Sequence, residues 1–324
     1  MVTPVVSSLV SAIVPVHDRP RLLEEAVASV LAQTYRPLEV VIVDDGSTDE
    51  TARVADRLAD ERPAEVRVLH VANGGPGRAR EAGRAVARGE FIQYLDSDDL
   101  LLPGKFEWQV EALGREPGAG VAYGWTSYVV GEGAAAGRPW KRTGERIERM
   151  FPSFLESRWW GTSTPLYRRS VTDAAGPWSD LWNEEDWEYD CRVAALGVRL
   201  AYVPRPVSIQ RDHGGKRLSR WVSSDPRKLQ NRAVAHALIL AHARRAGIGP
   251  DAPEMRHFAR ELFLLSRQCG AAGLADESRE LARLSRSASR GGPGGLDVWL
   301  YARLAELVGW RRLARAVGWL DRLR

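Results

Sequence analysis

Short apolar runs alternate with amphipathic helical segments over the first hundred residues, and this alternation restricts the fold more than any other feature. The runs are rich in β-branched residues, which predicts strands, and the segments between them carry apolar residues at helical spacing. A repeated order of strand and helix predicts a parallel sheet with right-handed crossovers. The predicted strands are residues 11–16, 38–43, 66–70 and 91–95, and the predicted helices are residues 20–33, 51–58 and 78–87.

Acidic residues follow three of these strands: Asp18, the pair Asp44 and Asp45, and the run 96–99, which reads Asp-Ser-Asp-Asp. The carboxyl ends of parallel strands share one edge, where ligands bind, so we expect these side chains to line one cleft. Three carboxylates within four residues repel one another, and Mg²⁺ or Mn²⁺ held together with substrate phosphates would neutralise them. An acidic turn leading into a helix is the alternative explanation.

Two common phosphate-binding loops are absent from the sequence. No G-x-x-x-x-G-K-[ST] motif occurs, which argues against a P-loop kinase or GTPase. Residues 74–77 are rich in glycine, but they do not form G-x-G-x-x-G and do not follow the first strand. A dinucleotide-binding fold is therefore disfavoured, and a bound diphosphate would depend on a metal ion for neutralisation.

Composition excludes several other classes. The net charge of the 324 residues is +4, but the arginines are scattered among acidic residues, so we expect no nucleic-acid partner. Cys191 and Cys269 cannot form a disulfide framework and lack zinc spacing, which favours a reducing cytoplasm. No apolar run approaches the roughly 20 residues that span a bilayer, and the first residues lack a basic segment typical of a signal peptide. We therefore expect a soluble, cytoplasmic protein.

Residues 120–215 are less regular, with a strand predicted at 198–203 and a Gly-, Ala- and Arg-rich loop at 131–144. Trp159 and Trp160 suit either core packing or a platform for a sugar ring. The acidic start of the helix near residue 185 is explained either by the helix dipole or by a general base. His213 lies in a polar, Gly-containing loop where it could be structural or functional.

From about residue 225 only amphipathic helices are predicted, at 228–245, 252–269, 276–287 and 296–322. We therefore expect an α/β domain over residues 1–222 and a separate helical domain over residues 223–324. The last helix is basic and contains tryptophan, as helices on anionic membranes do. Packing on the preceding helices or on a second subunit is the favoured explanation, since Gly309 and Gly318 weaken a free-standing helix.

Taken together, these motifs resemble family 2 glycosyltransferases of the GT-A fold, a mostly parallel sheet flanked by helices. Each matching piece is weak alone, but the pieces occur in the order of the family and cover roughly residues 10–215. The matching pieces are residues 12–18, 29–35, 41–49, 79–80, 89–92, 95–99 and 185–188.

The resemblance implies a role for each matched residue. Pro15, Val16 and Asp45 would line the nucleotide of a sugar donor, with Asp18 and Arg80 nearby. Asp96, Ser97 and Asp98 would form the DxD motif, in which Asp98 binds the metal and Asp96 faces the ribose and metal, with Asp99 as a less certain third carboxylate. Asp186 matches the general base, Glu185 and Trp160 are further substrate-binding candidates, and His213 would close over the diphosphate and reach the metal.

The resemblance also implies an inverting enzyme that uses Mg²⁺ or Mn²⁺ and transfers one sugar, most often from a UDP-sugar. The acceptor would be a small molecule, a saccharide or a lipid-linked molecule, and a homodimer is compatible with the sequence. Glu81 stands where the family has Asn, and residues 217–221 depart from the Gln-x-x-Arg-Trp motif of processive synthases. The competing hypotheses are a nucleotidyltransferase and an inactive nucleotide-sugar-binding module.

Overall fold

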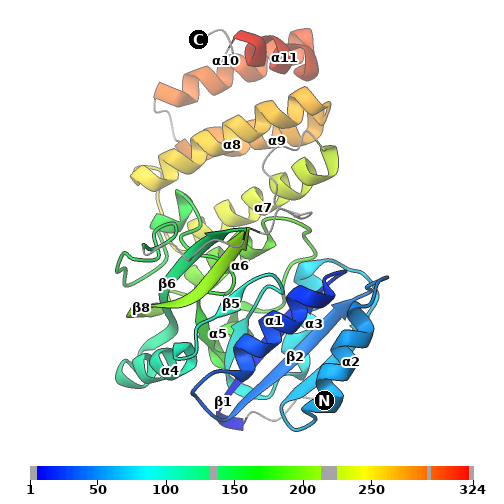
Figure 1. Cartoon of the computed structure of the whole chain (residues 1–324). Coiled ribbons are helices and arrows are strands. Elements are labelled where there is room, and N and C mark those ends of the chain that lie inside the picture. The colour runs from blue at the N-terminus through cyan, green and yellow to red at the C-terminus, as the bar shows by residue number, and fades with distance from the viewer. Residues whose placement is uncertain (1–5, 132–137, 213–224, 290–292, 321–324) are drawn as a thin grey trace. The chain divides into compact units, whose positions relative to one another are not determined.

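The computed structural model describes residues 6–131, 138–212, 225–289 and 293–320, and these form two compact units (Figure 1). Unit 1 comprises Met1–Met150, Trp159–Asp180 and Leu196–Lys216. Unit 2 comprises Phe151–Arg158, Leu181–Ala195 and Arg217–Arg324. The chain therefore passes between the units several times.

Unit 1 is built around an eight-stranded sheet with the strand order β3-β2-β1-β4-β7-β6-β8-β5 among the described residues. Strands β3, β2, β1 and β4 are parallel to one another, β7 is antiparallel to both its neighbours, and β6 runs parallel to β8. The sheet is therefore mixed, with its parallel half formed by the predicted strands. The strands are β1 (Val6–Val16), β2 (Leu38–Asp45), β3 (Val66–Val71), β4 (Gly89–Tyr94), β5 (Leu100–Leu101), β6 (Ala119–Val130), β7 (Leu166–Arg168) and β8 (Arg199–Asp212).

Helices cover both faces of the parallel half. Alternate residues of a strand point to opposite faces, and Val10 and Val14 join the apolar cluster that contains Leu23 and Val27 of the first helix. On the other face, a Cβ added to Gly83 would lie 2.4 Å from Cγ2 of Ile13, so only glycine permits this close packing. The helices of unit 1 are α1 (Pro20–Leu31), α2 (Thr51–Glu61), α3 (Pro76–Val86), α4 (Lys105–Arg115) and α5 (Arg169–Ala175).

The second half of the sheet corrects the sequence-based prediction. The stretch predicted as irregular after residue 120 is β6, a twelve-residue strand, and the strand predicted at 198–203 is the fourteen-residue β8. Pro206 pairs with Trp125 between two register shifts, and proline is tolerated in a strand at such irregularities. Pro204 and Pro206, which follow the predicted strand, therefore lie inside β8.

Unit 2 is helical among its described residues. It contains a short 3-10 turn (Ser153–Leu155), α6 (Glu185–Ala194), α7 (Pro226–Arg245), α8 (Pro253–Ala272) and α9 (Ala275–Ser289), followed by α10 (Pro293–Val308) and α11 (Trp310–Leu320). The single helix predicted over 296–322 is wrong: Gly309, at φ +92°, separates α10 from α11. Val298, Tyr301, Ala305 and Trp310 form an apolar cluster, so one face of the pair packs inside unit 2.

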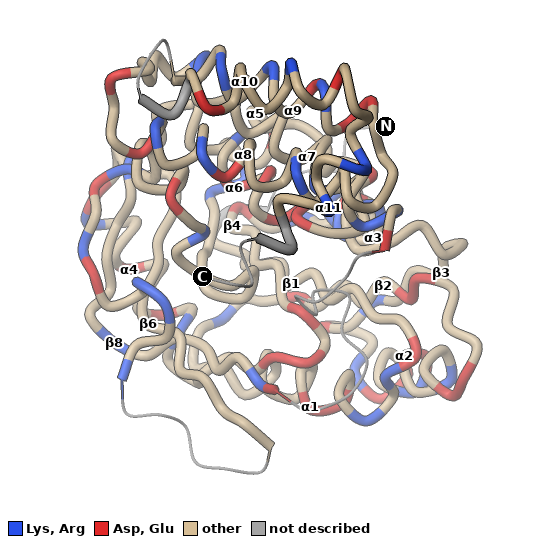
Figure 2. Tube along the Cα trace, turned by 90° about the horizontal axis from the view of Figure 1, so that it is seen from above, with Lys and Arg blue, Asp and Glu red and all other residues tan. Residues whose placement is uncertain are grey.

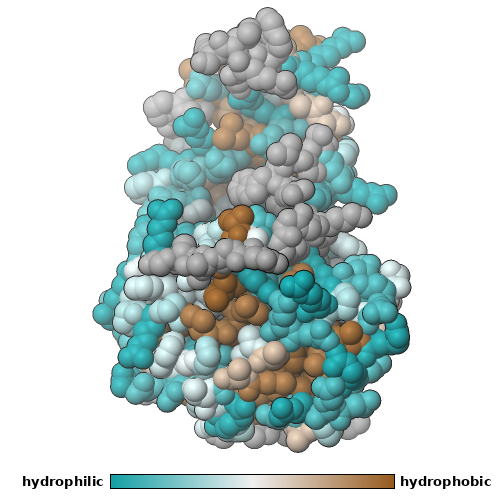
Figure 3. All heavy atoms as spheres, viewed as in Figure 1, coloured by the Kyte–Doolittle hydropathy of each residue, from teal (hydrophilic) through white to brown (hydrophobic). Residues whose placement is uncertain are grey.

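Basic and acidic residues are mixed along the chain trace (Figure 2), and many form ion pairs within one helix, such as Arg57 with Glu61 and Arg283 with Glu280. The face drawn in Figure 3 is mainly hydrophilic and is interrupted by smaller apolar areas. In the described part of the chain, no helix combines the length and apolar character needed to cross a bilayer.

Candidate active site

The sheet brings the predicted acidic residues of the first strands to one edge. β1 and β2 are parallel and in register, with Val16 opposite Asp44, and β1 is parallel to β4 on its other side. Their carboxyl ends therefore point the same way, toward Asp18, Asp45 and the acidic run after β4. Pro15 and Val16 lie in β1 itself and are buried.

Asp96, Asp98 and Asp99 form a compact acidic cluster after β4. One carboxylate oxygen from each lies within 4.8 Å of the others. Asp99 is buried at 1% exposure, while Asp98 retains 9%. Burial, and then the charges of Asp98 and Asp96, hold the pKa of the Asp99 carboxyl well above its ordinary value. Its surroundings therefore disfavour the charged form of Asp99.

Three arginines form hydrogen bonds with this cluster and offset part of its negative charge. These contacts were not predicted from the sequence. Arg19 Nη1 donates to Asp98 Oδ2 at 2.8 Å, and Arg80 Nη2 donates to Asp96 Oδ1 at 2.7 Å. Arg211 Nε donates to the carbonyl oxygen of Asp98 at 2.6 Å. Arg80, predicted to lie near the nucleotide, is thus held against a carboxylate of the acidic cluster and is only 4% exposed.

The donor set of the cluster fits a hard divalent cation. Carboxylate oxygens are the ligands that Mg²⁺ and Mn²⁺ prefer, and three converge here. A cation would relieve the repulsion that disfavours the charge on Asp99. Arg19 would have to share or give up Asp98 when a metal binds. His213, the other predicted ligand, lies outside the described residues.

Asp45 closes the loop that leads into α3. Its Oδ1 accepts from the Gly74 N–H at 2.7 Å and its Oδ2 from the Gly75 N–H at 2.9 Å. Gly46, at φ +67°, is required beside it, since a Cβ there would lie 2.7 Å from the nitrogen of Asn73. Both oxygens of Asp45 therefore bind the protein backbone, and nucleotide contact would use their remaining lone pairs.

Asp18 joins the loop after β1 to the loop after β2. Its Oδ1 accepts from the Thr48 N–H at 2.7 Å, and its own N–H donates to Ser47 Oγ at 3.1 Å. The Thr48 hydrogen bond lowers the pKa of the Asp18 carboxyl. Next to it, His17 Nδ1 lies 3.0 Å from the carbonyl oxygen of Asp45. These contacts hold the loops after β1 and β2 together at the carboxyl edge of the sheet.

Trp160 is fully buried, and its ring packs against Tyr123 with centroids 5.2 Å apart. Trp159 is 1% exposed and lies under the guanidinium of Arg142. As placed, Trp160 has no accessible face on which a sugar could stack. Core packing accounts for its position, and its predicted substrate role stays a prediction.

Asp186 and Glu185 lie in unit 2, in the first turn of α6. Arg158, 9% exposed in its side chain, pairs with Asp186 and places its Nε 2.7 Å from Oδ2 of the buried Asp190. Glu184, at φ +61°, turns the chain into the helix. Asp186 is 30% exposed in its side chain. Glu185 is buried at 6% exposure.

Four contributors to these sites were not found from the sequence: Arg19, Arg158, Ser163 and Arg211. Ser163 Oγ donates to Asp99 Oδ2 at 2.9 Å, and the Arg211 N–H donates to Asp99 Oδ1 at 3.3 Å. Only Arg19 carried a usable signal, because it follows Asp18 at the end of a strand whose edge was already predicted to hold the cleft. The other three reach their partners through the fold alone.

Part of the chain is similar in sequence to known glycosyltransferases. A family model described as glycosyl transferase family 2 matches residues 11–172. Among curated relatives, glycosyltransferase GlyG of Streptococcus pneumoniae is 41% identical over 104 residues, which cover 31% of this chain and 34% of that protein. The chain therefore aligns with only about a third of the length of such relatives.

Solved structures extend the similarity to nearly the whole chain. TarS 1–349 of S. aureus in complex with UDP matches with a TM-score of 0.67 at 19% identity, covering 95% of this chain and 91% of that chain. The mannosyltransferase PcManGT from Pyrobaculum calidifontis, solved with GDP-Man and Mn²⁺, matches with a TM-score of 0.51 at 19% identity over 96% and 84%. At this identity the likeness establishes the fold, which is the expected GT-A arrangement with a helical C-terminal region.

Proposed function

Because the chain belongs to glycosyl transferase family 2, we propose that it transfers one sugar from a nucleotide-diphosphate sugar to an acceptor hydroxyl, with inversion and with the help of Mg²⁺ or Mn²⁺. The observation that carries the proposal is the acidic cluster Asp96, Asp98 and Asp99 beyond the carboxyl ends of parallel strands. UDP is the proposed donor nucleotide, and TarS, a structural neighbour, was solved with UDP.

The donor would bind at the edge of the sheet built from β1, β2 and β4. Asp18, Asp45 and the loops they fix would shape the nucleotide site, while Asp96 and Asp98 would hold the cation. When bound, the cation would supply positive charge that stabilises the leaving diphosphate. Arg19 is a second source of positive charge at this position, because its guanidinium already contacts Asp98.

The chemical step needs a base, and Asp186 is the proposed one. The acceptor oxygen forms a bond to the anomeric carbon, and the bond from that carbon to the diphosphate breaks with its electron pair. The proton of the acceptor hydroxyl moves to a carboxylate oxygen of Asp186. Arg158 contacts that carboxylate and would hold its position. A single displacement inverts the anomeric centre and needs no carboxylate nucleophile.

A screen of nucleotide-sugars with Mn²⁺ tests the proposal. Thermal shift reports binding to the folded state, and the products report the reaction. A glycosyltransferase releases the nucleoside diphosphate, a nucleotidyltransferase would release pyrophosphate, and an inactive binding module would release neither. Addition of EDTA should abolish release of the nucleoside diphosphate. Release that continues at an unchanged rate in EDTA would contradict the metal role.

A further inference from the structure

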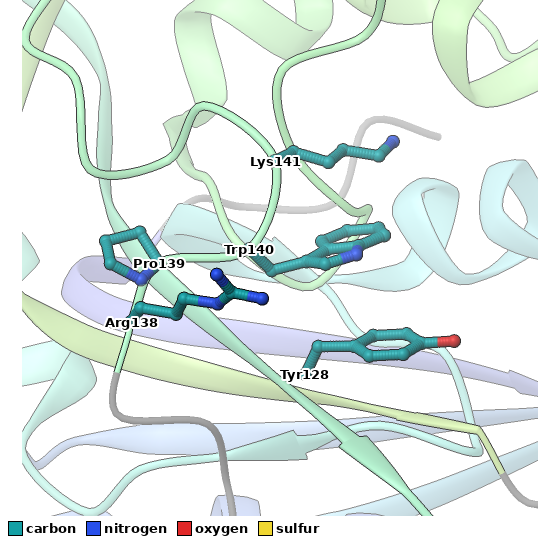
Figure 4. A pocket seen from close by; sticks show the side chains of 5 residues that line it. All are labelled: Tyr128, Arg138, Pro139, Trp140 and Lys141. Carbon is teal, nitrogen blue, oxygen red and sulfur yellow. The ribbon is translucent and has the colours of Figure 1, made fainter.

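A cavity of about 340 Å³ lies in unit 1, and none of the residues that were predicted to bind the donor lines it (Figure 4). Five residues line it: Tyr128, Arg138, Pro139, Trp140 and Lys141. Tyr128 belongs to β6, and the other four follow within the same stretch that the sequence suggested to be a loop. None of them has a role in the proposed donor site.

Hydrogen bonds connect the segment that lines the cavity to β6. The Trp140 N–H donates to the Thr126 carbonyl oxygen at 2.7 Å, and Thr143 Oγ1 donates to the Trp140 carbonyl oxygen at 2.7 Å. The same Thr143 hydroxyl accepts from the Thr126 N–H at 3.1 Å. These three hydrogen bonds fasten the segment around Trp140 to β6, so its side chains line a defined cavity.

Two aromatic rings and two cations meet in this cavity. The rings of Tyr128 and Trp140 are nearly parallel, at 9°, with centroids 5.6 Å apart. Lys141 Nζ lies 4.5 Å from the centre of the Trp140 ring, and Figure 4 shows Arg138 directed toward the two rings. The stacked pair offers apolar surface to the C–H groups of a sugar, and Arg and Lys recognise phosphate or carboxylate. The combination suits a saccharide that carries negative charge.

The cavity and the acidic cluster share a strand. Asp212, at the end of β8, accepts from the Tyr128 hydroxyl at 3.1 Å, whereas Arg211, its neighbour, contacts Asp98 and Asp99. Successive residues of a strand point to opposite faces, so one strand end supports the cavity on one side and the acidic cluster on the other.

A second connection runs through residues 161–163. A Cβ added to Gly161 would lie 3.4 Å from the Trp140 ring and 2.5 Å from the Gln210 side chain. Two residues later, Ser163 donates its hydroxyl hydrogen bond to Asp99. Residues 161–163 therefore link the wall of the cavity to the acidic cluster.

We propose that this cavity binds the acceptor, and that the acceptor is a saccharide bearing phosphate or carboxylate groups. The inference rests on the proposed transfer reaction and adds the class of its acceptor. Arg138 and Lys141 would bind the negative charge, and Trp140 with Tyr128 would contact the sugar rings.

Binding of three disaccharides to the full chain tests the proposal: trehalose, trehalose 6-phosphate and digalacturonic acid, followed by ligand-observed NMR. One or both of the charged disaccharides should bind at least about tenfold more tightly than trehalose, which corresponds to about 1.4 kcal/mol. Preference for the phosphate or for the carboxylate identifies the kind of anion. Equal binding of all three would overturn the proposal.

The double variant Arg138→Ala/Lys141→Ala should lose this preference. The matched control is Arg53→Ala/Arg115→Ala, which removes two exposed arginines elsewhere in unit 1 and should bind like the wild type. If both variants lose the preference for charged disaccharides equally, the preference depends on net charge alone, and the proposed site is wrong. Circular dichroism checks that both variants are folded, and Lys141→Gln alone provides a milder change should the double variant unfold.

UDP binding in the presence of Mn²⁺ separates the two proposals. We expect the same UDP-induced thermal shift in the double variant as in the wild type. If the wild type binds no nucleotide but keeps its preference for charged disaccharides, the proposed function fails while the saccharide site stands. If nucleotide binding and transfer are normal and the cavity variants change neither disaccharide binding nor transfer, the acceptor site alone is wrong.

Discussion

Asp98 is held at both its side chain and its backbone, and this determines what its substitution would do. Its carboxylate accepts from Arg19 and its carbonyl oxygen accepts from Arg211. After burial, its charge is the next cause of the raised pKa of Asp99. Asparagine would keep an acceptor for Arg19 and remove the repulsion. We expect Asp98→Asn to change the free energy of unfolding without metal by no more than about 1 kcal/mol.

The same variant should lose the Mn²⁺-induced thermal shift and at least about 10²-fold of the transfer rate, because a ligand of the cation is gone. Asp276→Asn is the control, since its side chain is 94% exposed on α9. Wild-type turnover by Asp98→Asn, or a stability loss of several kcal/mol, would assign Asp98 a structural role.

Asp186 is the proposed base, and its substitution should separate donor binding from transfer. Asparagine has the same shape as aspartate but cannot take up the proton, so Asp186→Asn should bind donor normally and lose about 10²-fold or more in transfer. Donor binding by thermal shift and transfer by product release measure the two effects separately. An equal loss in donor affinity and in rate would place Asp186 in the donor site. If the single variant stays active, the double variant with Glu185→Gln shows whether Glu185 replaces it.

At the scale of elements, His70 on β3 connects β2 to α2. Its Nδ1 lies 2.9 Å from Asp44 Oδ2, and its Nε2 lies 2.9 Å from Asp56 Oδ1. The hydrogen bond to Asp44, and then that to Asp56, raises the pKa of His70. Burial opposes the charge on Asp44, but hydrogen bonds from Ser47 and His70 outweigh it and lower the pKa of Asp44.

A raised histidine pKa stabilises the fold fully below the unfolded value of about 6.5 and loses this effect as pH rises through the folded pKa. The lowered pKa of Asp44 contributes above about pH 4 and is lost in acid. Between pH 6 and 9 the wild type should therefore lose more stability than His70→Gln, by less than about 1 kcal/mol because His70 is 46% exposed. Urea unfolding at both pH values measures this difference. If the free energy of unfolding falls equally in the two proteins between pH 6 and 9, the prediction is wrong.

α10 has one buried and one exposed apolar face, and we expect the two faces to contribute differently to the free energy of unfolding. Tyr301 is 7% exposed and packs edge-on against Phe263, whereas Leu307 on the same helix is 82% exposed. Tyr301→Ala should destabilise the protein by about 3 kcal/mol through the cavity that it leaves. Leu307→Ala should stay within about 0.5 kcal/mol. Thermal unfolding of the two variants provides the comparison, and similar losses would mean that the outer face is also packed in solution.

The burial and pairing of the strands explain which parts of the fold and of the site could be predicted from the sequence. β1, β2 and β4 are buried on both faces and form nearly continuous apolar runs, so their positions, and the acidic edge that follows them, were predictable. β8 was not, because Pro204 and Pro206 look like a strand end until the irregular pairing with β6 is known. Arg19 and Asp98 are 79 residues apart in sequence, and no local pattern predicts such a pair.

At the scale of the whole molecule, the chain does not divide cleanly at one point. The predicted boundary at residue 222 would leave α6, with Asp186, in a fragment of residues 1–222. Within unit 2, however, Glu188 of α6 is 1% exposed and pairs with His242 of α7 at 2.8 Å. Trp187 packs edge-on against His236 of α7 and Phe258 of α8. Several partners of α6 therefore lie beyond the boundary, whereas Arg158 lies before it.

We expect the fragment of residues 1–222 to lose order in residues 181–195 while the sheet of unit 1 keeps its structure. Removal of α7 and α8 exposes the apolar surface of Trp187 and takes His242 away from Glu188, so the short α6 loses a large part of its stabilisation. Hydrogen exchange read by mass spectrometry measures this, with residues 11–99 as the internal control. Protection of residues 181–195 equal to that in the full chain would mean that α6 is stabilised within the first 222 residues. Loss of protection there, with UDP binding retained, would assign donor binding to unit 1 and the support of the proposed base to the C-terminal helices.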